Sequence, residues 1–263
     1  MKIISTSILA GALISAFLAG YFFPKKATTE KTVAGQFNSQ LARSFNADSE
    51  LPNFSTYQDV KLKKADFFAY LLPRVKKANQ TILQERLWVE SLLSQGNEFN
   101  QTQMHMLLTL SEKYKVKALN PKTMISELLS RVDTIPASLV LAQAANESAW
   151  GTSRFARQGN NLFGQWCYVK GCGIIPKSRD NNQRHEVASF KNIQQSINSY
   201  MHNLNSQISY TNLRKLRKDM RQNKQTVSGI MLAHGLLKYS TRREAYVEEI
   251  QAMIRQNKLA QYD

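Results

Sequence analysis

The sequence predicts an α+β fold that is mainly helical and carries a small β-hairpin lobe. Three observations lead to this prediction. Apolar residues recur at helical intervals over most of the chain after residue 64, strand-like alternation is confined to residues 166–190, and only 11 Gly and 6 Pro occur among 263 residues. So few turn-forming residues argue against an all-β protein. The hydrophobic fraction of 43% supports a packed core and excludes wholesale disorder.

Residues 1–24 contain an uncharged apolar run from Ile3 to Phe23, with lysines on both sides. At about 1.5 Å per residue, a helix of this length crosses a hydrocarbon layer of roughly 30 Å. We therefore expect an N-terminal membrane anchor, with a cleaved signal peptide and a buried core helix as the alternatives. The first two place the protein in the cell envelope, either anchored in the inner membrane and facing the periplasm or exported after signal cleavage.

Export changes the expected oxidation state of the two cysteines, Cys167 and Cys172. In an oxidising compartment two nearby cysteines tend to pair, whereas in a cytosolic enzyme the same spacing is more often reduced and inert. We therefore expect a disulfide between them.

The remainder of the chain divides into three segments by composition. Residues 25–63 are polar, rich in Ser, Thr, Asn and Gln, and lack periodicity, which predicts a tether. Residues 64–120 show helical patterns over 64–95 and 101–114, and are expected to pack on the domain that follows. Pro73 is expected to kink or divide the first of these helices.

Residues 121–263 are expected to form the catalytic domain. Helices are expected at residues 121–132, 137–150, 192–204, 211–222, 226–237 and 243–257. Between the second and third helices, QWCYV and GII flank Lys170 and Gly171 like the two arms of a hairpin. A polar loop over 176–184 precedes a strand at 185–190.

Glu147 is the candidate general acid. Val140, Ala144 and Glu147 share one helical face, which is otherwise apolar and is expected to point inward. Desolvation disfavours the ionised form of a carboxyl group and keeps it protonated near neutral pH. Trp150 follows as a flat apolar wall, and Gly151 is expected to end the helix. The alternative is a helix-end glutamate paired with a nearby arginine.

A second acidic residue is expected on the β lobe. Hydrolysis of a glycosidic bond commonly needs one carboxyl to protonate the leaving oxygen and another group to position water or stabilise positive charge. Glu186 is favoured over Asp180 because a strand fixes the direction of a side chain better than a loop does. The alternative role for Glu186 is that of a solvent-facing strand residue.

Two motifs carry a resemblance to a known family. The segment LAQAANESAWGTSRFARQGNNLFGQW resembles the bacterial glucosaminidase family, which comprises lysozyme-like peptidoglycan hydrolases with LAQA-x-x-ES-x-WG-x-S followed by NNLFG. The continuation WCYVKGCGIIPKSRDNNQRHEVASF, with SYMHNLN and REAYVEEI, is similar to the Bax-type branch. The resemblance is strong over 121–259 and weaker from residue 64 onward. One departure is Ala149, where many relatives carry Gly.

The resemblance implies a lysozyme-like fold and β-1,4-N-acetylglucosaminidase activity on the glycan strands of peptidoglycan, without a cofactor. The glutamate of its ES-x-WG element is the general acid, which is Glu147 here. Its second acidic residue lies on a mobile hairpin lobe, in the region of Glu186. A tyrosine near the end of the domain lines the cleft, and Tyr246 matches it better than Tyr239 does. The alternative for this tyrosine is a core aromatic on an amphipathic helix.

Further candidates for substrate binding lie around the NNLFG motif. Asn160 and Asn161 can hydrogen-bond to sugar hydroxyl or N-acetyl groups, or can serve only to shape a turn. Trp150, Phe163 and Trp166 can stack on sugar faces, although aromatic residues more often pack in the core. Of these three, Trp150 is favoured as a cleft wall.

Several other functions are disfavoured by the sequence. Its four histidines are scattered and no HExxH is present, so no metal site is expected, and no nucleotide-binding fingerprint occurs. The formal net charge of +16 suits an anionic partner. A basic cluster is expected to be a solvated helix face that attracts acidic lipid headgroups or cell-wall carboxylates, and not nucleic acid. Its members are Arg214, Lys215, Arg217, Lys218, Arg221 and Lys224. The protein is expected to be a monomer that reaches the membrane through its N-terminal segment.

Two alternatives to the glucosaminidase remain. A lytic transglycosylase also uses a single glutamate in a lysozyme-like fold, but cuts the other glycan bond and closes an anhydro ring. A non-catalytic glycan-binding module would keep the groove without the reaction, although the presence of both Glu147 and Glu186 argues against it.

Overall fold

The computed structural model describes residues 50–95, 98–177, 179 and 183–263, all of which belong to the unit that spans residues 37–263. The expected anchor at 1–24 lies outside the described residues, as does most of the expected tether. In the part of the chain that is described, no helix combines the length and the apolar character needed to cross a bilayer.

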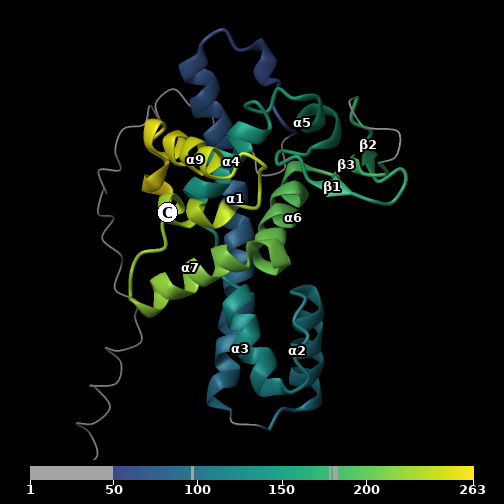
Figure 1. Ribbon diagram of the computed structural model, residues 1–263, viewed down its shortest axis with the longest axis vertical. Coiled ribbons are helices and arrows are strands. Elements are labelled where there is room, and N and C mark those ends of the chain that lie inside the picture. Colours follow the sequence, from purple (N-terminus) through teal and green to yellow (C-terminus); the bar gives the residue numbers. More distant parts are fainter. Residues whose placement is uncertain (1–49, 96–97, 178, 180–182) are drawn as a thin grey trace, which may run out of the picture. The chain divides into compact units, whose positions relative to one another are not determined.

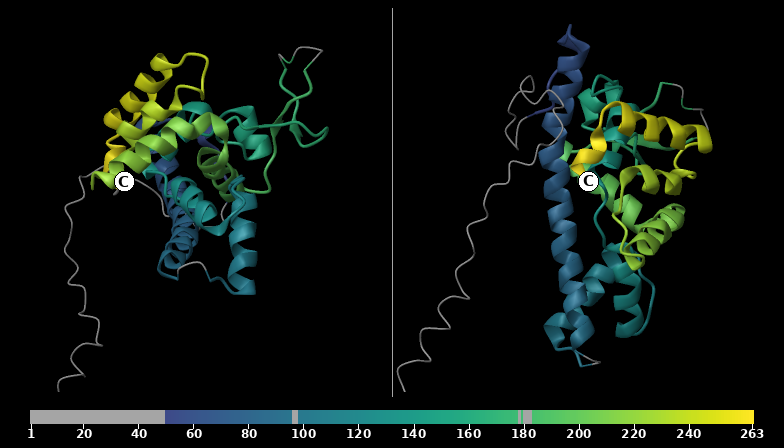
Figure 2. Two further views of the ribbon diagram at one scale, coloured as in Figure 1. Left: turned by 60° about the horizontal axis from the view of Figure 1, so that its bottom comes forward. Right: turned by 90° about the vertical axis from the view of Figure 1, so that its left-hand side faces the viewer.

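The longest helix, α1 (Val60–Ser91), contacts α3 (Pro121–Arg131), α4 (Ala137–Glu147) and α6 (Ile193–Ser206), as Figures 1 and 2 show. It continues through Pro73, so of the two expected effects of this proline, a kink or a division, the division does not occur. A proline inside a helix costs about 3 kcal/mol. Phe68, Leu71 and Val75 around it are buried, and each such side chain contributes roughly 1.5–3 kcal/mol. Burial therefore outweighs the cost of the proline.

The folded body begins before residue 64, so the expected end of the tether is too late. The Asp59 carboxylate accepts hydrogen bonds from backbone N–H groups of the first turn, and α1 starts at Val60. Farther upstream, a short 3-10 helix, η1 (Phe54–Thr56), buries the ring of Phe54 against Phe67, with 5.3 Å between ring centroids. A single buried aromatic in a polar segment has no periodicity, which is why the sequence pattern missed it.

The other helices follow the expected pattern with three differences. α4 ends three residues before the expected end at Trp150. The helix expected at 226–237 is broken into a short helix, α8 (Gly229–Leu232), and a 3-10 turn, and another short helix, α5 (Arg154–Gly159), lies in a region where none was expected. The remaining elements are η2 (Leu92–Ser94), α2 (Gln101–Lys113), α5 (Arg154–Gly159), η3 (Ile208–Tyr210), α7 (Thr211–Gln222), α8 (Gly229–Leu232), η4 (Ala233–Leu236), α9 (Glu244–Gln256) and η5 (Leu259–Tyr262).

The β lobe is a three-stranded antiparallel sheet of β1 (Trp166–Cys167), β2 (Gly173–Ile174) and β3 (Glu186–Ala188) in the order β1-β3-β2. The expected hairpin is wrong in one respect, because β1 and β2 do not pair with each other. Each pairs with β3, which lies between them. In Figure 1 the lobe projects beside α5 and α6. The predicted class, α+β and mainly helical with a small β lobe, is confirmed.

Helix α4 is the centre of the helical body. It is buried continuously from Ala137 to Ala145, with α1, α8, α9 and η5 around it. A helix that is apolar on every side has to be buried, and its alanines let neighbouring helices approach closely. The Asp263 carboxylate fixes its first turn by accepting from the backbone N–H and hydroxyl of Ser138, at 2.8 and 2.7 Å. The opposite end of α4, which carries Glu147, is therefore held in place.

The basic cluster on α7 is not a solvated face as a whole. Arg214 and Arg217 are 4% and 1% exposed and donate to backbone carbonyl groups. Arg221 donates from Nε and Nη2 to the buried carboxylate of Asp133, at 2.5 and 2.6 Å. A guanidinium group has five N–H donors, so one arginine side chain can hydrogen-bond to several carbonyl and carboxylate groups and join loops to helices inside the protein. The lysines of the cluster are exposed, and the Arg221 side chain is 42% exposed.

Candidate active site

Glu147 is the last residue of α4 and is half-buried. Its Oε1 atom accepts a hydrogen bond of 2.6 Å from the hydroxyl group of Tyr246 on α9. Tyr246 is 3% exposed. Of the two tyrosine candidates, the structure therefore brings Tyr246 against the carboxyl group. The hydroxyl of Tyr239 instead donates to the backbone carbonyl of Phe163, at 2.8 Å.

A tight turn follows Glu147 and ends the helix. Residues 149–151 all have positive φ, of 50°, 59° and 76°. The hydroxyl of Ser148 donates to the carbonyl of Ala144 at 2.6 Å and accepts from the N–H of Gly151 at 2.7 Å. A Cβ atom on Gly151 would lie 2.8 Å from the Phe54 ring. Glycine is therefore required there for its backbone conformation and for space, and this turn fixes the position of the carboxyl group from its C-terminal side.

Three buried polar side chains form a directed hydrogen-bond chain that ends on Glu147. The hydroxyl of Tyr200 on α6 donates to Gln143 Oε1 on α4. Gln143 Nε2 donates to the hydroxyl oxygen of Tyr246, at 2.9 Å, and Tyr246 donates to Glu147. Gln143 is fully buried and Tyr200 is 2% exposed. Each group in the chain donates to the next one toward Glu147. The hydroxyl oxygen of Tyr246 therefore accepts from Gln143, and its proton points at the carboxyl group.

Burial raises the pKa of Glu147 above its ordinary value. The hydrogen bonds from Tyr246 and Asn146 act in the opposite direction, and the nearby charge of Glu249 adds to the rise. The carboxyl group also lies at the C-terminal end of α4, where the helix dipole disfavours negative charge. Among the described residues no ion pair to Glu147 is found; Arg242 pairs instead with Glu249, at 2.9 Å. The alternative role of Glu147, a helix-end glutamate paired with an arginine, is therefore not found among the described residues.

We expect Tyr246→Phe to move the basic limb of the pH–rate profile to higher pH. In the unmodified protein the hydrogen bond from Tyr246 lowers the pKa of Glu147, so a variant without this bond should have a higher Glu147 pKa. A general acid works while protonated, and its activity declines as the pH rises through its pKa. The profile of kcat/KM against pH on soluble glycan measures this shift. Tyr239→Phe is the matched control, and a basic limb that moves equally in both variants would contradict the role of Tyr246.

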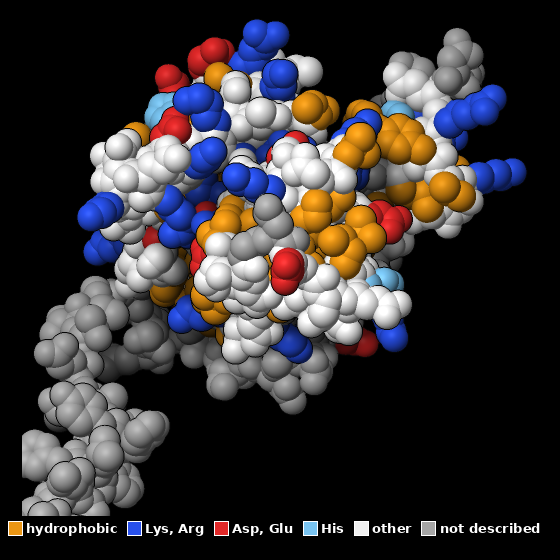
Figure 3. All heavy atoms as spheres, turned by 90° about the horizontal axis from the view of Figure 1, so that it is seen from below, with side chains coloured by type: hydrophobic (Ala, Val, Ile, Leu, Met, Phe, Trp, Pro, Cys, Tyr) orange, Lys and Arg blue, Asp and Glu red, His pale blue; other side chains and the backbone are white. Residues whose placement is uncertain are grey.

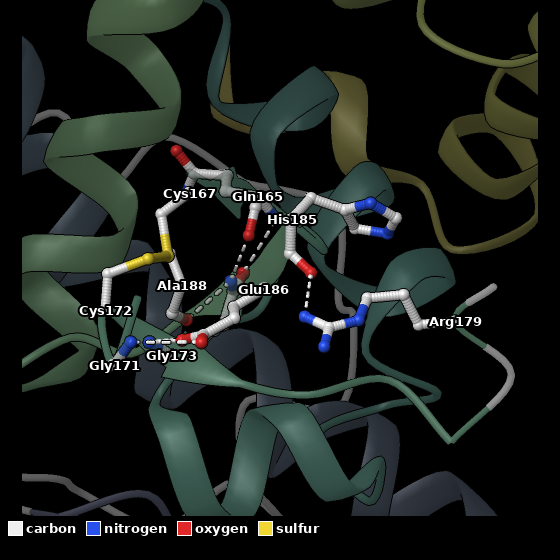
Figure 4. Close-up of a disulfide and its surroundings, with 10 residues drawn as sticks. Gln165, Cys167, Gly171, Cys172, Gly173, Arg179, His185, Glu186 and Ala188 are labelled. Atoms are coloured by element: carbon white, nitrogen blue, oxygen red, sulfur yellow. Dashed lines mark hydrogen bonds between the residues drawn. A yellow bond between two sulfur atoms is a disulfide. The ribbon is translucent and has the colours of Figure 1, made fainter. Parts of the chain in front are cut away.

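The carboxylate of Glu186 is held within the β lobe (Figure 4). Its two oxygens accept from the backbone N–H groups of Gly171, at 3.0 Å, and Gly173, at 2.8 Å. These bonds lower the pKa of Glu186. The side chain is buried, so the alternative of a solvent-facing strand residue is wrong. Its role as the second catalytic group stays a prediction, as does that of Asp180, which lies outside the described residues.

A disulfide joins Cys167 and Cys172 on the side of the lobe next to Glu186 (Figure 4). It closes the turn over residues 167–172, and the two N–H groups that bind the Glu186 carboxylate belong to Gly171 within this turn and Gly173 directly after it. The two sulfur atoms and a Glu186 oxygen lie within 4.8 Å of one another, the spacing of a metal site. Since sulfur in a disulfide is not a thiolate, this group does not offer a metal the ligands it needs.

Asn160 and Asn161 shape the turn that joins the lobe to the body, which was the alternative to sugar binding. Asn161 Nδ2 donates to the carbonyl groups of Gln165 and Ala188, and its Oδ1 accepts from the N–H of Gln165. It is 1% exposed. Asn160 adopts the left-handed conformation, with φ of 51°, and donates to the carbonyl of Phe190. Both amide groups are thus engaged with the backbone.

The three aromatic candidates for stacking on sugar faces differ in how deeply they are buried. Phe163 is a core residue stacked on Tyr200, with ring centroids 3.9 Å apart, so its expected role as a cleft wall is wrong in this arrangement. Trp150 is half-buried and contacts the ring of Phe68 edge-on. Trp166 is 58% exposed and stacks on His185. Trp166 therefore offers more free surface than Trp150, which the sequence favoured.

Gln143 and Tyr200 are functional candidates that sequence reasoning missed. One signal was available, because Gln143 is the one polar side chain in the otherwise apolar run LVLAQAA. A polar group at such a position has to find a buried partner. The identity of that partner depends on α6 and α9, which lie far away in the sequence.

Comparisons with known proteins show the family to which the chain belongs. Residues 122–259 match the model of the glucosaminidase family, described as mannosyl-glycoprotein endo-beta-N-acetylglucosaminidase. The chain is 33% identical over 220 residues to protein bax of Escherichia coli (strain K12), covering 83% of this chain and 78% of the relative. A crystal structure of the catalytic domain of the autolysin Auto from Listeria monocytogenes matches 66% of this chain and 94% of its own, at 18% identity and a TM-score of 0.37, which is too low to support a structural argument. The chain belongs to the glucosaminidase family of glycoside hydrolases.

Proposed function

We propose that this protein hydrolyses β-1,4 N-acetylglucosaminyl bonds in the glycan strands of peptidoglycan, with Glu147 as general acid. The observation that carries the proposal is the carboxyl group of Glu147, whose pKa burial raises and whose Oε1 accepts the Tyr246 hydroxyl. The family match supplies the reaction class. Peptidoglycan as the substrate rests on the sequence resemblance.

The hydrogen-bond direction assigns different tasks to the two oxygens of Glu147. Oε1 accepts from Tyr246, so we assign the acidic proton to Oε2. As the glycosidic C–O bond breaks, this proton passes to the leaving oxygen, and the water that later bonds to the anomeric carbon returns a proton to Glu147. Between these two transfers Glu147 is a carboxylate, and the Tyr246 hydroxyl stabilises its charge through a charge-assisted hydrogen bond. The same bond is weaker when Glu147 is neutral, so it favours the transition state over the ground state.

We propose Glu186 as an ionised group that stabilises positive charge near the anomeric carbon. Its lowered pKa keeps it charged at neutral pH, as that task requires. Both of its oxygens accept backbone N–H groups, which argues against a direct bond to the attacking water while the lobe has this conformation. Help from the N-acetyl arm of the substrate would supply the missing nucleophile or base.

We also propose that the protein works outside the cytoplasm, tethered to the membrane by residues 1–24, as a monomer. The Cys167–Cys172 disulfide supports export, because such bonds persist in oxidising compartments.

Mass spectrometry of peptidoglycan digested by the full-length protein tests this proposal. A glucosaminidase leaves fragments that end in reducing N-acetylglucosamine, and we expect these products. Anhydro-sugar ends would identify a lytic transglycosylase instead. Binding to sacculi without any release of fragments would identify a glycan-binding module. Either of these two outcomes would reject the proposed reaction.

A further inference from the structure

A cavity of about 470 Å³, lined by both charged and apolar side chains, lies between η2, α3 and α7 and includes Arg86 on α1. None of the catalytic candidates lines it. Its walls carry the side chains of Arg86, Lys122, Arg217, Lys218 and Arg221, together with a single carboxylate, that of Asp133. Figure 3 looks onto the end of the molecule formed by α2 and α3, and shows Lys and Arg side chains gathered on the side where α7 lies.

Positive charge at this cavity exceeds the carboxylates that balance it. Asp133 takes two bonds from Arg221 and has Arg86 Nη1 at 3.5 Å and Arg217 Nε at 3.6 Å. One further carboxylate, Glu90, pairs with Arg86 at 2.8 Å. Three guanidinium groups therefore share two carboxylates before the lysines are counted.

The mutual repulsion of these arginines affects the pKa of Arg217. Burial, together with the charges of Arg86, Arg221 and Arg214, lowers the pKa of Arg217 to about 10, while the charge of Asp133 opposes this shift. A bound anion would relieve this repulsion, since opposite charge nearby favours the charged form of each guanidinium.

Donors without a partner lie at the rim of the cavity. Lys122 on α3 and Lys218 on α7 are exposed, and the described part of the chain offers neither ammonium group a carboxylate within ion-pair distance. The hydroxyl groups of Ser126 and Ser130 line the same wall. Two ammonium groups, hydroxyl groups and a partly exposed guanidinium are the donor set that the anionic oxygens of a tetrahedral phosphoryl group need. Leu129 adds an apolar surface beside them.

We propose that this cavity binds a phosphoryl group, with Lys122, Lys218 and Arg221 as the charged donors. The phosphoryl group belongs either to a free phosphate compound or to the headgroup of an anionic lipid. This site is separate from Glu147 and does not depend on the proposed reaction.

Isothermal titration of the full-length protein in non-ionic detergent, at fixed ionic strength, tests the site. The probes are inorganic phosphate and dihexanoyl-phosphatidylglycerol below its micellar concentration, with the zwitterionic choline lipid as a reference for apolar binding. We expect saturable binding with one site per chain. In Lys122→Gln/Lys218→Gln we expect the affinity to fall about 10-fold or more. Both lysines are exposed, so the melting temperature should not change.

Lys117→Gln/Lys238→Gln is the matched control, because it removes the same charge from exposed positions outside the cavity. It should change the affinity less than about 2-fold, in the range of surface charge effects. Tighter binding of the glycerol lipid than of phosphate and of the choline lipid would identify a lipid headgroup, and equal or tighter binding of phosphate would identify a free phosphate compound. Absence of saturable binding, or equal losses in both double variants, would overturn the site and leave only non-specific attraction to a net charge of +16.

Discussion

Glu147→Gln is expected to reduce the release of soluble fragments from purified sacculi by about 10²–10⁴-fold, the contribution typical of a general acid. Glutamine has the same shape and keeps an oxygen that can accept the Tyr246 hydroxyl, so the hydrogen-bond chain remains intact. It has no proton acidic enough to protonate a leaving sugar oxygen. The loss should appear in kcat more than in KM, because the acid acts on the transition state.

The control for this variant is Glu249→Gln. Glu249 lies on α9 and forms an exposed pair with Arg242, so it changes charge near the site without contacting Glu147. We expect it to keep most of the activity. Fragment release by Glu147→Gln at the rate of the unmodified protein, with the fold intact by circular dichroism, would remove Glu147 from the mechanism.

Asp133→Asn is expected to lower the free energy of unfolding by about 3–5 kcal/mol, the usual cost of removing one partner from a buried ion pair. The Asp133 side chain is 4% exposed and holds Arg221 by two hydrogen bonds, with Arg86 and Arg217 beside it. Without its charge, the fully buried guanidinium of Arg217 loses its compensating carboxylate. Urea denaturation followed by circular dichroism measures the change.

The acid stability of the protein checks the same network by a second route. Burial alone would raise the pKa of Asp133, but the Arg221 hydrogen bonds and the charges of Arg217 and Arg86 outweigh it and lower this pKa. A lowered pKa stabilises the folded state above the ordinary aspartate range, and this stabilisation disappears as the pH falls through the lowered value. Asp133→Asn should lack this part of the acid dependence.

The matched control is Asp219→Asn on α7. Asp219 pairs with Lys215 at 2.8 Å in solvent, where such a pair contributes about 0–1 kcal/mol. A loss of equal size in Asp219→Asn and Asp133→Asn, or a loss below about 1 kcal/mol in Asp133→Asn, would show that the buried network does not hold α7 to the body.

Local sequence signals predicted most of the helices and placed the candidate acid, Glu147, near the end of one of them. Asn120 and Pro121 begin α3 where a cap followed by a first-turn proline predicts it, and the apolar run from Ala137 predicts a buried α4. Such signals depend on neighbours within one or two turns, so they can be found in one chain. Pro73 shows the limit of local rules, because burial of the residues around it decides that α1 continues.

The sequence by itself determined the helical class, the β region and the family, and it singled out Glu147 as the candidate acid, because each depends on short-range pattern or on a contiguous motif. Tertiary structure alone decided which groups surround that carboxyl. Tyr200, Gln143 and Tyr246 come from α6, α4 and α9, and no local pattern specifies contacts between such distant segments. Tertiary structure also decided that β3 lies between β1 and β2, and that Arg214 and Arg217 on the polar helix α7 are buried. Packing selects these pairings, since buried polar groups are stable only where the fold supplies a partner.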